Sequence, residues 1–155
     1  MDVAAELRDI VREFDIDPSR LRIEITETVM MTDIENRMRI LSELRGEGFV
    51  VEIDDFGSGY SSLNMLKDMP VDVLKIDMAF LTKDEDNGKA RTIVRNMIQL
   101  SQELGIASLT EGVETDAQYQ ALSDMGCRLF QGYYFAKPMP VDEFEAFCRS
   151  HSGEK

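Results

Sequence analysis

The chain has 155 residues, a formal net charge of −13 and 43% hydrophobic residues. That length allows one domain with a sizeable core. The strong negative charge argues against nucleic-acid backbones and anionic membranes as partners. We therefore expect neither nucleic-acid binding nor membrane insertion, and a phosphodiester ligand would need a cation to mediate its contact with this chain.

The cysteine content indicates a reducing compartment. Only Cys127 and Cys148 are present, which is too few for a disulfide framework. Nothing in the sequence resembles a signal peptide or a spanning helix. We therefore predict a cytoplasmic location and a packing role for both cysteines.

Hydrophobic periodicity predicts strands and helices that alternate along the chain. An amphipathic helix near 3–14 comes first, and a loop containing Pro18 follows it. Strands are expected over 21–26, 50–54, 73–77, 106–110 and 128–131. Helices are expected from a capping box at 32–35 to Gly46, and over 61–67, 90–104, 115–126 and 141–150, with an exposed loop over 83–89. In the last helix, Phe144, Phe147 and Cys148 are predicted to face inward.

This order predicts an α/β fold with about five parallel strands joined by right-handed crossovers. A complete (β/α)₈ barrel takes ~250 residues, so the prediction is a partial barrel of the triosephosphate isomerase type. We interpret residues 1–155 as a single truncated domain, with strand–helix units from about 21 to 150.

Chemically unusual residues fall at or near the C-terminal ends of the predicted strands, where the active sites of such barrels form. They are Glu24, Asp54, Asp55, Lys75, Glu111 and Gln131. Acids with one lysine, and no histidine or cysteine nearby, specify oxygen ligation of Mg²⁺ or Mn²⁺ rather than zinc. Two such metals could clamp the attacking and leaving oxygens of a phosphodiester.

Each of these residues also has a purely structural interpretation. The adjacent acids at 54 and 55 could form a solvated turn, and Glu24 could be an isolated charge instead of a ligand. Lys75 could pair with acids only to satisfy its own buried charge. Spacing alone leaves these alternatives open.

Five stretches resemble, in order, the motifs of EAL domains, the phosphodiesterases that open the bacterial second messenger cyclic di-GMP. The central one is the run of ten residues from Asp54 to Leu63. The others are Glu24–Glu27, Leu74–Asp77, Glu111–Glu114 and Gln131–Pro138. The resemblance extends from about Leu21 to Phe147 and corresponds to the C-terminal part of such a domain.

The resemblance implies metal-dependent hydrolysis of cyclic di-GMP to linear pGpG at a two-metal Mg²⁺ or Mn²⁺ site. Its implied metal-site residues are Glu24, Asp54, Asp55, Glu111 and Gln131. It implies a catalytic role for Lys75, which would orient the attacking water, and for Glu111. Glu27 would brace the loop after Asp55. Gly57, Ser58 and Gly59 would contact the substrate.

The chain departs from the family pattern in its first half. The Glu-Ala-Leu tripeptide that names the family is absent. A family glutamate and asparagine of the first metal site belong to strands that this chain does not contain. We therefore expect slow turnover of cyclic di-GMP by the chain alone. The chain could also be the cytoplasmic part of a larger sensory protein. The alternatives are a non-catalytic module that binds cyclic di-GMP or a protein, and a fragment that forms oligomers.

Five strands of an eight-stranded barrel leave two open edges, at 21–26 and 128–131. Unpaired backbone donors and acceptors at such edges invite pairing with another chain. We therefore predict that the chain self-associates, either through these edges or by burying its inner face against a second copy.

Overall fold

The computed structural model describes residues 3–54, 56, 66–77 and 87–151. Its centre is one five-stranded parallel sheet with the strands in sequence order, β1-β2-β3-β4-β5. The strands are β1 (Arg22–Thr26), β2 (Val50–Asp54), β3 (Val73–Asp77), β4 (Ala107–Glu111) and β5 (Leu129–Gln131). The helices are α1 (Val3–Glu13), η1 (Pro18–Arg20), α2 (Glu27–Met30), α3 (Ile34–Gly46), α6 (Asn87–Glu103), α7 (Asp116–Asp124) and α8 (Val141–His151). The predicted partial barrel of alternating parallel strands and helices is confirmed.

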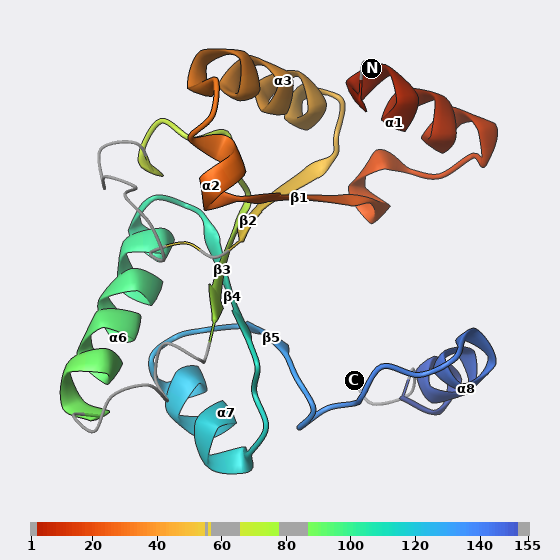
Figure 1. The fold of residues 1–155 in the computed structure, drawn as a ribbon. Helices are drawn as coiled ribbons and strands as arrows, with labels where there is room; N and C mark the ends of the chain where they lie inside the picture. The colour runs from red at the N-terminus through yellow and green to blue at the C-terminus, as the bar shows by residue number, and fades with distance from the viewer. Residues whose placement is uncertain (1–2, 55, 57–65, 78–86, 152–155) are drawn as a thin grey trace.

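The two faces of the sheet differ because successive side chains of a strand point to opposite sides. In Figure 1, α3, α6 and α7 arch around one side of the sheet. The main hydrophobic core lies between these helices and the sheet, and its strand residues are Val51, Ile53, Leu74 and Ile76. The intervening residues of the same strands, among them the acids and Lys75, occupy the opposite face.

A second, smaller core attaches α1 to the beginning of the sheet. Ala4 and Val11 of α1 are buried with Leu44 of α3 and Phe49, the residue before β2. Arg8 also donates hydrogen bonds to the Glu47 carboxylate at 2.7 and 2.8 Å. The predicted amphipathic helix near 3–14 is therefore present, and it covers the N-terminal end of the sheet.

The capping box predicted at 32–35 is absent, whereas the helix predicted over 115–126 begins with one. At α7 the box is present, because Gln118 N donates to Thr115 Oγ1 and Thr115 N donates to the Gln118 side chain. At α3 the prediction is wrong. The N-cap there is Asp33, which adopts a left-handed backbone conformation and makes no side-chain cap hydrogen bond. Thr32 instead donates its hydroxyl to the Val29 carbonyl.

The loop predicted over 83–89 is wrong in its described part, because α6 already begins at Asn87. The inward packing predicted for the last helix is also wrong. α8 buries none of its residues, Phe144 is 54% exposed, and Cys148 is exposed while Cys127 is buried. In Figure 1, α8 lies apart from the sheet, at the end of the chain that follows β5. Its apolar face therefore has no core to enter within the described chain.

Two further predictions concern the short helix over 61–67 and the absence of a membrane-spanning helix. The short helix predicted over 61–67 lies largely outside the described residues. No helix among the described residues is both long and apolar enough to cross a membrane.

Candidate functional site

The side chain of Lys75, in the middle of β3, is the centre of the candidate site. Its Nζ lies 2.9 Å from Glu24 Oε2, 3.1 Å from Glu111 Oε2 and 3.4 Å from Asp54 Oδ1. These acids come from β1, β4 and β2, so four strands contribute to a single cluster on the inner face. The parallel register accounts for this, because Thr26 pairs with Asp54 and Asp77 pairs with Glu111 at the same edge of the sheet.

Burial and charge act on Lys75 in opposite directions. The side chain is only 7% exposed, and this desolvation lowers its pKa. Hydrogen bonds to Glu24 and Glu111, together with the charges of Glu111 and Asp54, outweigh it and raise the pKa well above the usual value. Lys75 is therefore a permanent cation at neutral pH, fixed among three carboxylates.

The acids around Lys75 are not equivalent. Burial raises the pKa of Glu111, the hydrogen bond and charge of Lys75 oppose this rise, and the charges of Asp54 and Asp77 reinforce it. Asp54 Oδ1 is fully buried and accepts no hydrogen bond within the described residues, so its contact with Lys75 is an ion pair only. Glu24 is the most open of the three, with its side chain 48% exposed.

A second ion pair lies one layer below this cluster. Glu52 is 4% exposed and pairs with Arg22 across β1 and β2. In the register of these strands, Glu52 stands directly beside Glu24 on the same face. Arg22 thus neutralises the charge of the deeper Glu52 carboxylate, and Lys75 pairs with the three acids nearer the strand ends.

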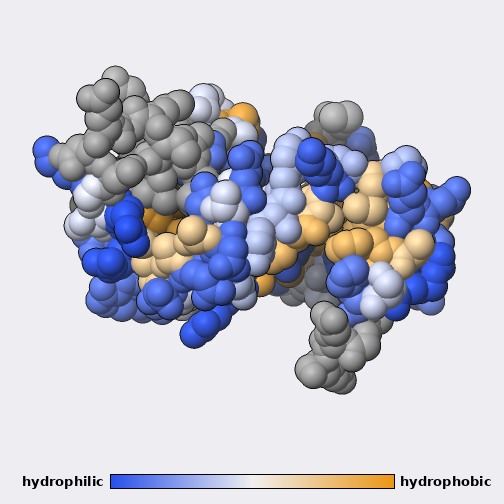
Figure 2. Space-filling model, turned by 90° about the horizontal axis from the view of Figure 1, so that it is seen from below, coloured by the Kyte–Doolittle hydropathy of each residue, from blue (hydrophilic) through white to orange (hydrophobic). Residues whose placement is uncertain are grey.

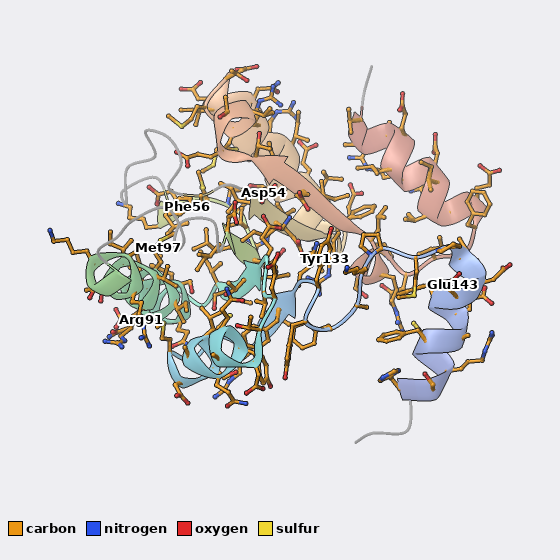
Figure 3. The ribbon with its side chains drawn as sticks, turned by 60° about the horizontal axis from the view of Figure 1, so that its bottom comes forward. Asp54, Phe56, Arg91, Met97, Tyr133 and Glu143 are labelled. Atoms are coloured by element: carbon orange, nitrogen blue, oxygen red, sulfur yellow. The ribbon has the colours of Figure 1, made fainter. Side chains whose placement is uncertain are left out.

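A hollow of about 370 Å³ adjoins the cluster beyond the ends of β4 and β5. It is lined by Asp77, Glu111, Gly112, Glu114, Gln131, Gly132 and Tyr133. Figure 3 shows Tyr133 between the sheet and α8, whereas Arg91 lies on α6 at the other side of the molecule. An acidic wall with one aromatic side chain suits a cation-bearing or cation-mediated ligand with a planar group.

Glycine at position 132 holds this wall together. A Cβ built there would lie 2.1 Å from the Val113 carbonyl oxygen, so no other residue fits. On either side, Val113 N donates to the Gln131 carbonyl and Tyr134 N donates to the Val113 carbonyl. These bonds fix the turn after β4 against the turn after β5, which sets Gln131 beside Glu111.

Four of the predicted site residues therefore cluster tightly, and Gln131 lines the adjoining hollow. Asp55 and the predicted substrate contacts Gly57, Ser58 and Gly59 lie outside the described residues. Glu27 is 1% exposed and begins α2, directly after β1. Its bracing of the loop after Asp55 stays a prediction, because that loop is not among the described residues.

Sequence patterns indicated no role for several residues that shape the site. Glu52 could have been found from strand alternation, since it shares a face with Asp54 two residues further on. Asp77 could have been found from its place at the end of β3. The positions of Glu114 and Tyr133 follow from the paired turns after β4 and β5, which strand periodicity does not encode.

The cluster has the donor chemistry that a divalent cation requires, although Lys75 now occupies its centre. Among the described residues, no group of three or more His, Cys, Asp or Glu side chains is arranged to hold a metal ion. The available ligand atoms are nevertheless carboxylate oxygens, which Mg²⁺, Mn²⁺ and Ca²⁺ prefer. The buried Asp54 Oδ1 also accepts no hydrogen bond within the described residues, so its lone pairs are not taken up by another donor there. These residues fit a hard divalent metal.

Comparison with known proteins agrees with the fold. The family profile described as "EAL domain" matches residues 2–138. Cyclic di-GMP phosphodiesterase RocR from Pseudomonas aeruginosa is 36% identical over 94% of this chain and 37% of its own length. The crystal structure of the EAL domain of Mycobacterium smegmatis DcpA is 37% identical, with a TM-score of 0.86 over 95% of this chain and 66% of that chain.

A further solved structure combines the fold with ligands. The manganese and cyclic di-GMP complex of Klebsiella pneumoniae BlrP1 is 34% identical, with a TM-score of 0.79 over 88% of this chain and 35% of that chain. A related BlrP1 structure is a calcium and cyclic di-GMP complex.

The half-barrel thus has the architecture found in the EAL domain of DcpA. The chain belongs to the EAL domain family. It corresponds to part of such a domain, because it spans well under the full length of RocR and about two thirds of the DcpA domain.

Proposed function

We propose that this chain carries the catalytic end of a metal-dependent phosphodiesterase that hydrolyses cyclic di-GMP to linear pGpG. The observation that supports this most strongly is the placement of Lys75 among Glu24, Asp54 and Glu111. The relatives support it too, since RocR is a cyclic di-GMP phosphodiesterase. We further propose that residues 1–155 act as one truncated domain of this family in the cytoplasm.

In this proposal, Glu24, Asp54 and Glu111 hold Mg²⁺ or Mn²⁺, together with Asp55 and Gln131. The bound cations would supply charge stabilisation to the phosphodiester as its oxygens gain negative charge. The carboxylates thereby make an anionic substrate acceptable to a chain of net charge −13.

Lys75 has two tasks in the proposed reaction. Its permanent positive charge offsets the mutual repulsion of the acids, so that they stay close without being protonated. Its Nζ also donates hydrogen bonds at the point where the acids converge, which orients the attacking water relative to phosphorus. A lysine that stays charged cannot serve as the general base. Glu111 would take part as a metal-holding carboxylate beside Lys75, from which its Oε2 lies 3.1 Å.

The test is hydrolysis of cyclic di-GMP by the purified chain with Mg²⁺ or Mn²⁺, followed by chromatography of the pGpG product. We expect slow but measurable turnover that falls at least a hundredfold in Lys75→Met, as is typical when a positioned polar group is lost. Arg39→Met is the matched control, because Arg39 pairs with Glu43 at the surface. Equal rates in the chain and in Lys75→Met would refute catalysis at this cluster. Binding of cyclic di-GMP without hydrolysis would indicate a non-catalytic module.

We also propose that the isolated chain self-associates. Among the strands of the described residues, β1 and β5 each pair with a single neighbour, which leaves one edge of each strand for another chain. Light scattering is the measurement, and a compact monomer at tens of micromolar, roughly the range for interfaces of standard size, would contradict the proposal.

A further inference from the structure

The buried charge of Glu52 defines its partner more sharply than any apolar surface of this chain does. Apolar burial has no preferred direction, so the apolar surface that Figure 2 shows on the side where α8 lies does not by itself identify a partner. A buried charge, by contrast, requires a counter-charge. Glu52 is 4% exposed on the inner face of the sheet, and its counter-charge is the guanidinium of Arg22.

The strand register places this ion pair next to a proposed metal ligand. Glu24 and Glu52 are paired positions of the parallel strands β1 and β2, so their side chains stand side by side on the inner face. Arg22 lies two residues before Glu24 on the same strand and the same face, which is roughly 6.6 Å along the strand. The guanidinium that reaches Glu52 is therefore also within reach of Glu24.

Glu24 and Arg22 both have freedom to rearrange, whereas Glu52 does not. The side chain of Arg22 is 50% exposed and that of Glu24 is 48% exposed. Glu24 Oε2 already contacts Lys75 Nζ at 2.9 Å. A second fixed cation on Glu24 would occupy its carboxylate and repel a divalent metal. The buried carboxylate of Glu52 prevents this, because it holds the guanidinium in an ion pair that is costly to break.

We infer that Glu52 is a positioning residue, whose buried carboxylate retains the Arg22 guanidinium and so keeps Glu24 open to a divalent cation. The inference rests on the proposed function, in which Glu24 is a metal ligand, and it adds a residue that touches neither metal nor substrate. Without Glu52, the guanidinium of Arg22 competes with the metal for Glu24. Without both charges, no competitor remains.

The experiment measures Mn²⁺ affinity by electron paramagnetic resonance in three variants of the full chain. Glu52→Met should weaken Mn²⁺ binding about tenfold, as is typical when a residue that supports a metal ligand is lost. Arg22→Met should not weaken it, because this variant removes the competing cation. The double variant Arg22→Met/Glu52→Met should return the affinity to within roughly threefold of the wild type, since a buried ion pair can be replaced by apolar side chains of similar volume.

A control and a stability measurement separate positioning from a purely structural role. Asp72→Asn frees the guanidinium of Arg45 at the other end of β3, and it should leave Mn²⁺ affinity unchanged. Thermal melts of all variants report folding. A purely structural ion pair would lower the melting temperature of both single variants and change their Mn²⁺ affinity alike. If Glu52→Met does not fold, Glu52→Gln takes its place, with the same direction expected for Mn²⁺ affinity.

A crystal structure of the Glu52 variant without metal gives a readout that does not depend on Mn²⁺. We expect the Arg22 guanidinium within hydrogen-bond distance of the Glu24 carboxylate. Arg22 directed into solvent, with Glu24 still on Lys75, would overturn the inference, and so would equal losses of Mn²⁺ affinity in the two single variants. Failure of the unaltered chain to bind Mn²⁺ would count against the proposed function, while the position of Arg22 in the crystal would still decide the inference.

Discussion

The outer and inner faces of this one sheet are built from alternate residues of the same strands, yet they obey different physical rules. On β2, Val51 and Ile53 are fully buried against helices, whereas Glu52 and Asp54 turn inward to charged partners. Burial of apolar area stabilises the outer face without regard to direction. The inner face depends on individual distances around Lys75. The outer face should therefore tolerate changes of apolar shape, whereas the inner face depends on the exact placement of its charged groups.

Removing apolar volume from the outer face should give the largest loss of stability. Ile53 is 0% exposed and belongs to the main core. Ile53→Ala should reduce the free energy of unfolding by about 3–4 kcal/mol, because it loses transfer energy and leaves a cavity. Urea unfolding measures this. The conservative variant Ile53→Val should cost only about 1 kcal/mol, and equal losses in the two variants would contradict the packing argument.

Removing the central charge of the inner face should cost somewhat less, and the loss should be reversible. Lys75→Met leaves three neighbouring carboxylates without their shared cation, which should cost about 2–3 kcal/mol after allowance for the exposure of Glu24. Mn²⁺ should restore part of this stability, since a divalent cation can replace the lost charge. Thermal melts with and without Mn²⁺ test it. Ile53→Ala provides the contrast, because Mn²⁺ cannot refill a cavity in the outer core.

A change at the helix that covers the outer face should have a moderate effect confined to stability. Thr115→Ala removes the side-chain acceptor at the N-terminus of α7 and should cost about 1 kcal/mol. Asp33→Asn at α3 should be close to neutral, because Asp33 makes no cap bond and asparagine tolerates the left-handed conformation. Chemical denaturation of both variants checks the difference. Equal losses would contradict the assignment of the caps.

The smallest expected effect is the pH dependence of Glu111. Its pKa is raised in the folded chain, so the folded state binds the proton more tightly than the unfolded state does. Stability from this group is therefore gained as the pH falls through the folded pKa towards the ordinary value of 4.5, and it is lost as the pH rises. Wild type should gain a small amount of stability relative to Glu111→Gln as the pH falls from neutral towards 4.5. A relative loss over that range would contradict the raised pKa.

The difference between the faces also explains what could be predicted from the sequence. Strand alternation placed Glu24, Asp54 and Lys75 on one face, and parallel order brought them to one edge with Glu111. Those predictions needed only the two-residue period of strand side chains and the parallel direction of the strands. The Arg22–Glu52 pair was not predicted, because periodicity gives the face of a residue but not its partner across strands.

Predictions failed where residue types alone do not determine which contacts or hydrogen bonds a segment makes. The apolar face of α8 was predicted to point inward, yet α8 has no described core to enter. The capping box at Thr32 was predicted from residue types, but the short helix α2 ends just before it and uses Thr32 for its own carbonyl. Asn87 and Gly88 were predicted as a loop, although they form the first turn of the longest described helix.

The most direct test of the central claim is Mn²⁺ binding, measured by electron paramagnetic resonance, to the chain and to two variants. Asp54→Asn keeps the shape of an acid beside Lys75 and removes its charge, whereas Asp72→Asn makes the same change at the far end of β3, where Asp72 pairs with Arg45. The account predicts that Asp54→Asn weakens Mn²⁺ binding at least tenfold, as expected when a ligating charge is lost, while Asp72→Asn does not. Equal Mn²⁺ affinity in the chain and in Asp54→Asn would contradict a metal site at the inner face.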